Sequence, residues 1–529
     1  AVNANLNCLI NFRRQQGATG QSNMWGQVEG TGLAGSGTGA SGKHGDTNKG
    51  AAASSEAYTK EGLPRSLPKM PEPDFVSEYP PSYFHRDPAK AVFEVAHREF
   101  GSPLEMQHRT TLTGMESQGF SPVKGLQVSV RTKEKTDKVL IFCNLPTSTQ
   151  DNHDGVCWAL KRGDQVLGCP SSSWVSELGR LDGLLLPWLD APGKARFDCE
   201  YSVSCRLRGS VQLSQRGERR QLTAVVVPEG QVASSESSEA LAVQPGRWYD
   251  VPGLQQISYT NTGEKVLVFC TIRYTALWSD ENTRGRFSIF RDGKPLDPEQ
   301  FGLQSVRALQ KGLKRVAVMT LMDDPPEGPH LYEVRAAVTA EEGETRVCHL
   351  DDQVRQLVLL RLPGSAVSGP CRCEALTTVD EDRWMEISGL SVTVTTKSSH
   401  DKVLLAWNAN FNPTGMDYEA YFTVIRSSGA GLKNLGSEEQ GMWSVASSSA
   451  GSSEYPASLF TDIPGAGTFT YTVHARSRRC GSLVEVPSVE VGPDGQISAV
   501  LLSSSRSAGD SSNVMEMMTR EMESARENA

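Results

Sequence analysis

The sequence predicts an all-β protein made of three tandem antiparallel β-sandwiches of the jelly-roll kind, with an extended N-terminal tail and a short C-terminal helix. Three observations lead to this prediction. One strand-like run occurs three times, further markers recur around each copy in one order, and the two ends of the chain differ in composition from the copies. At 529 residues the chain is also too long for a single hydrophobic core.

The clearest repeat is an apolar run that begins with an acidic residue and a lysine. It reads DKVLIFCN at 137–144, EKVLVFCT at 264–271 and DKVLLAWN at 401–408. An uninterrupted apolar run of this length is typical of a central strand with the core on one side and neighbours on the other. We expect the charged pair to mark the solvated start of each strand and the Val-Leu pair to begin the core.

Further markers surround each run at similar spacing. Upstream, an aromatic residue lies five residues before the glycine of a Gly-Leu pair in FSPVKGL, WYDVPGL and WMEISGL. Downstream, an alternating strand leads into an arginine and a glycine-containing turn, as in FSIFRDGKPL, which predicts a hairpin. The tyrosines of YSVSC, YEVRA and YTVHA follow the repeated lysine by 63, 67 and 69 residues, and QLTAVVV, QLVLLRL and QISAVLL close the copies. The common order and spacing indicate three copies of one domain.

These spacings define the predicted domains. The sandwiches span 100–232, 233–366 and 367–503, and each is long enough to bury a core of its own. Residues 1–99 are rich in Gly, Ser and Ala and then in Pro, which predicts an extended tail. Residues 504–529 predict a linker and a short helix with an Asn/Ser cap.

Charge and hydropathy exclude two classes of partner. The formal net charge of −9 is unfavourable for non-specific binding to nucleic acid, which requires a basic face. No stretch reaches the roughly 18 consecutive apolar residues of a membrane helix. We therefore expect neither a nucleic acid nor a membrane as partner.

The eleven cysteines contain no CxxC pair and no Cys/His spacing typical of zinc. We interpret them as reduced structural thiols of a cytoplasmic protein. The alternative is a secreted disulfide framework, for which a Cys199–Cys205 or Cys371–Cys373 bridge would be the sign.

The triplicated charged residues are candidates for chemistry, but a structural interpretation explains them better. Lys138, Lys265 and Lys402 open strands, and Asp190, Asp324 and Asp462 precede Pro/Gly turns, where aspartate caps the backbone. We predict no catalytic residue, no cofactor and no metal, so the protein is not expected to be an enzyme. A hydrolase that uses loop residues is the remaining enzymatic alternative.

Residues with a possible role in partner binding lie mainly outside the repeated markers. An arginine-rich segment of the first copy would suit an acidic partner, although a solvated hairpin is the alternative. The tail aromatics would act as anchors on a partner or pack against the chain's own sandwiches, and a methionine stripe lies on the predicted helix. The candidates are Arg206, Arg208, Arg216, Arg219, Arg220, Trp25, Phe75, Tyr79, Tyr83, Phe84, Met515, Met518 and Met522.

The order KVL, FSIFRDGKPL, GLQSV, MDDPPEG and YEVRA resembles jelly-roll units of the tumour necrosis factor/C1q-like kind, which occur in tandem in algal and other protist proteins. The whole chain, with tandem sandwiches, reduced thiols and a long tail, resembles algal flagella-associated proteins. This resemblance implies an axonemal doublet microtubule as binding surface, often in its lumen, with tubulin and other axonemal proteins as partners.

The predicted function is that of a non-enzymatic structural protein of the cytoskeleton, located in the cytoplasm and in the axoneme of a cilium or flagellum. It would bind the doublet microtubule through its tail and its sandwich surfaces, as a microtubule inner protein or from outside. The alternative is an extracellular adhesion or carbohydrate-binding jelly-roll protein.

Overall fold

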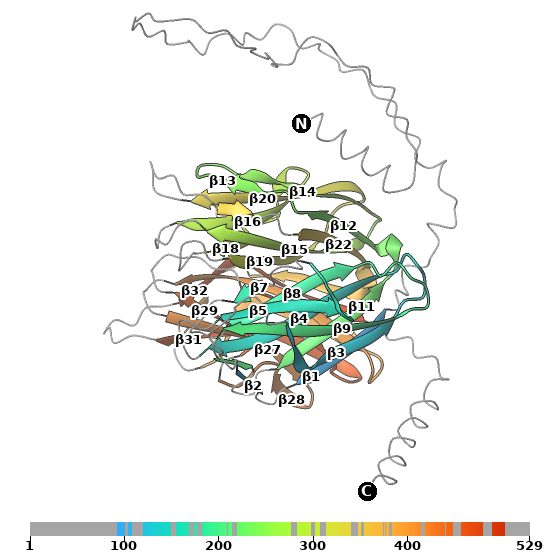
Figure 1. Cartoon of the computed structure of the whole chain (residues 1–529). Coiled ribbons are helices and arrows are strands. Elements are labelled where there is room, and N and C mark those ends of the chain that lie inside the picture. Colours follow the sequence, from blue (N-terminus) through green and yellow to red (C-terminus); the bar gives the residue numbers. More distant parts are fainter. Residues whose placement is uncertain are drawn as a thin grey trace, which may run out of the picture. The chain divides into compact units, whose positions relative to one another are not determined.

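The computed structural model describes residues 93–502 except for short gaps, and its regular structure there consists of β-strands and two 3-10 turns (Figure 1). This confirms the predicted all-β fold. The predicted tail up to residue 92 and the predicted helix within 504–529 lie outside the described residues. The gaps are 101–103, 108–119, 150–154, 169–173, 177–181, 209, 214–218, 277–282, 298–301, 307–313, 340–347, 351–353, 374, 376, 380–382, 414–417, 440, 448–455 and 480–488.

Sandwich 1 is formed by two antiparallel sheets. One sheet, called the inner sheet because it packs against the other two sandwiches, has the order β1-β11-β4-β10-β2, with β8 also paired to β4. The other, called the outer sheet, has the order β3-β9-β5-β6, with β7 paired to β5. The strands are β1 (Glu94–Phe100), β2 (Leu104–Gln107), β3 (Ser121–Arg131), β4 (Lys138–Thr149), β5 (Gly155–Arg162), β6 (Gln165–Val166), β7 (Trp174–Ser176), β8 (Asp182–Asp190), β9 (Asp198–Arg208), β10 (Ser210–Leu213) and β11 (Arg220–Val227).

Sandwich 2 repeats this arrangement. Its inner sheet has the order β12-β22-β15-β21-β13, with β19 on β15, and its outer sheet has the order β14-β20-β16-β17, with β18 on β16. The strands are β12 (Val232–Ser237), β13 (Leu241–Val243), β14 (Tyr249–Thr260), β15 (Glu264–Ala276), β16 (Arg284–Arg291), β17 (Lys294–Pro295), β18 (Gln304–Val306), β19 (Lys314–Asp323), β20 (Gly328–Thr339), β21 (Cys348–Leu350) and β22 (Arg355–Pro363).

Sandwich 3 has an inner sheet of order β23-β32-β26-β30, with β24 on β32, and an outer sheet of order β25-β31-β27-β28, with β29 on β27. The strands are β23 (Val367–Arg372), β24 (Thr377–Val379), β25 (Met385–Thr396), β26 (Lys402–Pro413), β27 (Tyr418–Ser428), β28 (Gly431–Asn434), β29 (Trp443–Ser447), β30 (Ala457–Asp462), β31 (Gly467–Arg479) and β32 (Val489–Leu502). In all three sandwiches the first and last long strands of the inner sheet are neighbours, as in a jelly roll.

The strand boundaries refine the predicted domains. The predicted start of sandwich 1 at residue 100 lies inside the structure's first strand, because β1 already pairs with β11 from Glu94 onward. Sandwiches 1 and 2 are joined by the 3-10 turn Glu229–Gln231, and sandwiches 2 and 3 by the 3-10 turn Gly364–Ala366. Both connections follow a proline and are too short to separate the sandwiches.

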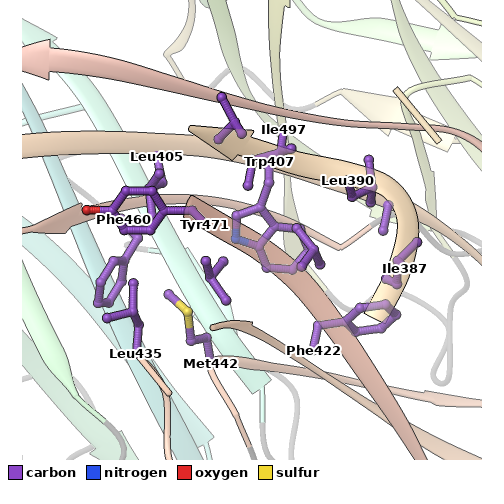
Figure 2. Packing of buried hydrophobic residues seen from close by; sticks show 14 of the residues in the cluster. Ile387, Leu390, Leu405, Trp407, Phe422, Leu435, Met442, Phe460, Tyr471 and Ile497 are labelled. Carbon is purple, nitrogen blue, oxygen red and sulfur yellow. The ribbon is translucent and has the colours of Figure 1, made fainter. Parts of the chain in front are cut away.

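Four hydrophobic cores hold the described residues together. Each sandwich has a private core between its own two sheets, and Figure 2 shows Trp407 in the private core of sandwich 3. A fourth cluster, the shared core, joins residues from the inner sheets of all three sandwiches. It consists of Phe93, Leu140, Phe142, Leu189, Val225, Val227, Val232, Leu267, Phe269, Met322, Val358, Leu360, Leu362, Val367, Leu404, Ala406, Leu459, Val500 and Leu502.

The repeated apolar run alternates between these cores. In β4, Val139 and Ile141 face the private core of sandwich 1, whereas Leu140 and Phe142 face the shared core. The corresponding residues of β15 and β26 divide in the same way. The run is apolar at every position because neighbouring side chains of a strand point to opposite faces, and here both faces are buried.

The Gly-Leu marker is a β-bulge in the first strand of each outer sheet. Gly125, Gly253 and Gly389 have φ angles of 84°, 72° and 82°, and the pairing register shifts at each of them. A side chain at Gly389 would collide with the carbonyl of Arg372. Glycine is therefore required by both the backbone conformation and the close approach.

Candidate interaction sites

Three glutamines join the sandwiches in a closed cycle. Gln356 of sandwich 2 donates from Nε2 to the carbonyl of Leu189 in sandwich 1, and its Oε1 accepts from the Leu189 N–H, both at 2.8 Å. Gln221 of sandwich 1 makes the same pair of bonds with Thr461 of sandwich 3, at 2.9 and 3.2 Å. The Oε1 of Gln496 in sandwich 3 accepts from the N–H of Met322 in sandwich 2 at 2.9 Å, which completes the cycle.

The glutamines bind to strand edges. The strands that receive them, β8, β19 and β30, each pair with a single neighbour among the described residues, so one row of their backbone groups has no strand partner. A glutamine amide carries one donor and one acceptor group that match the N–H and C=O of one residue. The contact therefore covers an edge that would otherwise be open to strand pairing with another chain.

A second polar contact accompanies two of the three glutamines. Thr271 donates to the carbonyl of Pro187 at 3.2 Å, and Asn408 donates to the carbonyl of Thr320 at 2.8 Å. Both residues end the repeated run and are register partners of Gln356 and Gln496. In sandwiches 2 and 3 the polar residue that ends the apolar run thus binds the sandwich that precedes it in the chain.

The acidic residue and lysine that open the run have separate roles. Asp137 accepts from the backbone N–H groups of Lys133 and Glu134 at 2.8 Å, which closes the preceding turn. Lys138 reaches Ser234 of sandwich 2 at 3.4 Å, and Lys265 donates to the carbonyl of Gly369 in sandwich 3. Burial lowers the pKa of Lys138. The expectation of solvated strand starts is therefore wrong for these two lysines, because the next sandwich lies within their reach.

The repeated aspartate belongs to a buried brace between the two sheets of each sandwich. Asp190 accepts from Arg162 at 2.7 Å and from the Tyr201 hydroxyl at 2.8 Å. The inner sheet supplies the aspartate, and the outer sheet supplies the arginine and the tyrosine. The other two braces are Arg291–Asp323–Tyr332 and Arg426–Asp462–Tyr471, with contacts of 2.6–3.0 Å.

Two expectations about these aspartates are corrected. The equivalent residue in sandwich 2 is Asp323, because it pairs with Val266 as Asp190 pairs with Val139, whereas the side chain of Asp324 is 61% exposed. The repeated aspartate is also more than a turn cap: Asp323 accepts from the N–H of Asp324 at 3.0 Å, but each of the three carboxylates also binds an arginine and a tyrosine of the other sheet. Its carboxylate points into the sandwich, where an arginine neutralises it.

The braces are suited to holding the sheets and poorly suited to catalysis. Burial raises the pKa of Tyr201, Tyr332 and Tyr471, and the neighbouring carboxylates raise it further. Each tyrosine therefore stays a neutral donor, and the carboxylate is already engaged by two partners. Neither group is free to act as base or nucleophile.

The structure separates the predicted arginine patch. Arg206 lies 5.6 Å from the ring centroid of Phe120, and Arg219 forms an ion pair with Glu99 at 2.7 Å. Arg220 is only 3% exposed at the start of β11, so its side chain is not available as a docking surface. Arg208 lies on β9, and Arg216 is outside the described residues.

A pocket of about 540 Å³ lies where sandwiches 1 and 3 meet. Arg219 contributes from sandwich 1, and the remaining lining comes from the β28 hairpin and the loop after it: Leu432, Lys433, Asn434, Gly436, Ser437, Glu438 and Glu439. Burial and the nearby Arg219 lower the pKa of Lys433. The lining carries both acidic and basic groups, so it favours neither an anionic nor a cationic ligand.

The tail aromatics Trp25, Phe75, Tyr79, Tyr83 and Phe84 and the methionines Met515, Met518 and Met522 lie outside the described residues. Their role in partner binding stays a prediction.

The cysteines of β9 are not paired in a disulfide. Seven cysteines of the described part of the chain form no disulfide: Cys143, Cys199, Cys205, Cys270, Cys348, Cys371 and Cys373. Cys199 and Cys205 lie six residues apart on β9, about 20 Å at the rise of a strand. A disulfide requires Cα atoms within about 7 Å, so this pair cannot bridge.

Among the described residues, no cluster of three or more His, Cys, Asp or Glu could hold a metal ion. No helix in this part has the length and hydropathy of a membrane span.

Sequence reasoning missed the glutamine cycle, although the signal was present. Gln221, Gln356 and Gln496 each stand directly before an almost entirely apolar stretch of a strand, LTAVVV, LVLLRL and ISAVLL. A polar residue kept at one position of a buried strand in three copies indicates a buried hydrogen bond.

Comparison with known proteins does not identify a family. No protein-family model matches the chain, and no curated protein matches it. The stem and receptor-binding domain of spike protein P1 from bacteriophage PM2 is 10% identical and aligns over 51% of this chain and 96% of its own, with a TM-score of 0.16. The CBM22-1–CBM22-2 tandem domain of Paenibacillus barcinonensis Xyn10C is 9% identical over 51% of this chain and 97% of its own, also at 0.16. TM-scores this low carry no argument about fold or function.

Proposed function

We propose that this chain is a non-enzymatic structural protein of a large cytoskeletal assembly that binds the doublet microtubule of a cilium or flagellum, for example as a microtubule inner protein. The observation that carries the proposal is the closed cycle of three sandwiches around the shared core. Such a body is a rigid block, and its repeated polar residues serve its own assembly. The doublet microtubule as partner rests on the resemblance to algal flagella-associated proteins.

The mechanism combines this block with the N-terminal tail. A rigid body that carries an extended segment can make several weak contacts at once, and their linkage in one chain raises the effective concentration of each contact. Binding would then depend strongly on the tail, while the fold of the sandwiches would not.

The experiment compares the full chain with a variant that lacks residues 1–88 for binding to salt-washed axonemes. The deletion ends before Phe93, because this residue is 1% exposed in the shared core and β1 follows it. We expect the truncated chain to keep its thermal unfolding midpoint and to bind axonemes at least about tenfold more weakly. Failure of the full chain to bind axonemes, or equal binding by both chains, would contradict the proposal. Recovery of the protein in the medium with affinity for glycans would favour the adhesion alternative.

A further inference from the structure

An apolar patch lies on the outer sheet of sandwich 2, on the side that faces away from the private core. Ile257 is the register partner of Leu331, and Tyr259 is the register partner of Pro329, on β14 and β20. Because side chains alternate along a strand, the core residues Tyr332 and Val334 point inward and these four point outward. Tyr259 is 49% exposed, which is unusual for a large side chain in this body. These four residues are called the platform below.

The other two sandwiches show that the fold does not require these residues. The same register positions hold Ser129, Arg131, Asp198 and Glu200 in sandwich 1 and Thr393, Thr395, Thr468 and Thr470 in sandwich 3. In sandwich 1, Arg131 and Asp198 form an ion pair at 3.8 Å, and in sandwich 3 the threonines form hydroxyl pairs at 2.9 and 3.1 Å.

One fold therefore accepts charged, hydroxyl and apolar side chains at four equivalent outward positions. Single exposed apolar residues are common on protein surfaces, but two adjacent apolar cross-strand pairs form a contiguous patch, which is typical of a binding surface. Only in sandwich 2 are both cross-strand pairs at these positions apolar.

Acidic groups border the platform. The 47% exposed side chain of Asp292 accepts from the N–H of Leu331 at 2.9 Å and contacts His330 at 2.7 Å. The exposed Glu327 lies two residues before Pro329 and accepts from Thr262. Arg361 donates to the carbonyl of Tyr259 at 2.7 Å and lies 4.0 Å from Glu264, so its charge is partly compensated.

We propose that the platform binds a protein partner that presents an apolar centre bordered by basic side chains. This inference rests on the proposed structural role and adds to it a contact made by the body itself, independent of the tail. Tyrosine is frequent among residues that dominate binding energy, and Tyr259 supplies a large surface on a rigid strand. The acidic border supplies charge complementarity, which selects the partner and its orientation.

The test replaces the platform with the residues that sandwich 3 carries at the same positions. The double variant Ile257→Thr/Tyr259→Thr and the matched control Ser129→Thr/Arg131→Thr are compared with the wild type for binding to salt-washed axonemes. We expect at least about tenfold weaker binding for the platform variant and less than about twofold change for the control, since few interface residues carry most of the affinity. Thermal unfolding reports whether each variant keeps its fold, and Asp292→Asn, which retains the turn, should weaken binding by about two- to fivefold.

Equal binding by the wild type and the platform variant would overturn the inference while leaving the proposed function intact. If the wild type does not bind axonemes, the proposed function fails, and a peptide library then tests the platform. In that library, apolar centres are flanked by either Lys/Arg or Asp/Glu. Enrichment of the basic-flanked peptides that is lost in Ile257→Thr/Tyr259→Thr supports the platform, and no such enrichment overturns it. Self-association of the wild type that this variant loses would assign the surface to a second copy and also overturn the inference.

Discussion

The inner and outer sheets of the three sandwiches have diverged to different extents. In each inner sheet the central strand keeps apolar residues on both faces. The strand on one side of it keeps a glutamine that binds another sandwich, and the strand on the other side keeps a braced aspartate. At equivalent outward positions of the outer sheets, the side chains are charged, apolar or hydroxyl-bearing. An inner residue packs against its own sandwich and its neighbours, so few replacements fit, whereas an outward residue must only suit a strand. Residues that recur in all three sandwiches therefore belong to the scaffold, whereas outward positions that differ between the sandwiches can acquire separate binding roles.

The largest expected loss in the free energy of unfolding is for a substitution in the shared core. Phe269→Ala removes a ring that is 1% exposed between the sandwiches, and we expect a loss of about 3–5 kcal/mol in the free energy of unfolding. Thr393→Ala on the outer sheet should change it by less than about 1 kcal/mol, because its side chain is exposed. Urea unfolding of the two variants measures both values. Similar losses for the two would show that the inner sheets are no more constrained than the outer ones.

An intermediate effect is expected for the glutamine cycle. Gln356→Ala leaves the backbone N–H and C=O of Leu189 without their partner, at a cost of about 2–3 kcal/mol. The matched outer-sheet variant Gln255→Ala, which removes a bond to Glu333, should cost about 1 kcal/mol or less. Hydrogen exchange at the Leu189 amide should accelerate only in Gln356→Ala. Unchanged protection of that amide would mean that the glutamine does not hold the edge.

The smallest effect concerns acid stability where sandwiches 1 and 3 meet. Burial alone would raise the pKa of Glu99, but hydrogen bonds from His97 and Gln221 and the charge of Arg219 lower it from 4.5 to about 2. A lowered carboxyl pKa stabilises the folded state above pH 4.5, and this contribution is lost as the pH falls toward 2. We expect Glu99→Gln to cost about 1 kcal/mol at pH 6, after allowance for partial exposure, and the difference from the wild type to shrink as the pH approaches 3.

Urea midpoints measured across this pH range test the Glu99 prediction. Asp198→Asn, on the outer sheet, serves as the control, because the Asp198 side chain is 75% exposed in its pair with Arg131 and should contribute less than about 0.5 kcal/mol. A constant difference between Glu99→Gln and the wild type at every pH would show that the carboxylate does not carry the effect.

The sequence predicts the strands better than the arrangement of the sandwiches. The run around Val139 and Leu140 shows that both faces of β4 are buried, because no polar position interrupts it. It does not show that Leu140 contacts the other two copies, since any apolar covering would produce the same pattern. Only the three-dimensional arrangement distinguishes the shared core from three separate cores.

The candidate sites were less predictable for a different reason. An aspartate before a Pro/Gly turn suits a turn cap, and this local interpretation concealed the brace in which Asp190 binds Arg162 and Tyr201. The partners lie 28 and 11 residues away, beyond local rules. In sandwich 3 the arginine and tyrosine that bind Asp462 lie 36 and 9 residues from it. The recurrence of an arginine and a tyrosine around the repeated aspartate is the sequence signal for a contact across the sandwich.

The glutamine contacts join the three sandwiches in a ring, whereas the polypeptide joins them in a line. Val232 and Val367 each follow a turn of three residues after a proline, and Val95 pairs with Val225 as Val232 pairs with Leu360. The contacts between the sandwiches therefore do not require a particular sandwich to come first in the chain. A circular permutant that joins Leu502 to Val95 through a four-residue linker ending in Phe93-Glu94, and opens the chain at 228–231, should fold to the same body with its sandwiches in the order 2, 3, 1.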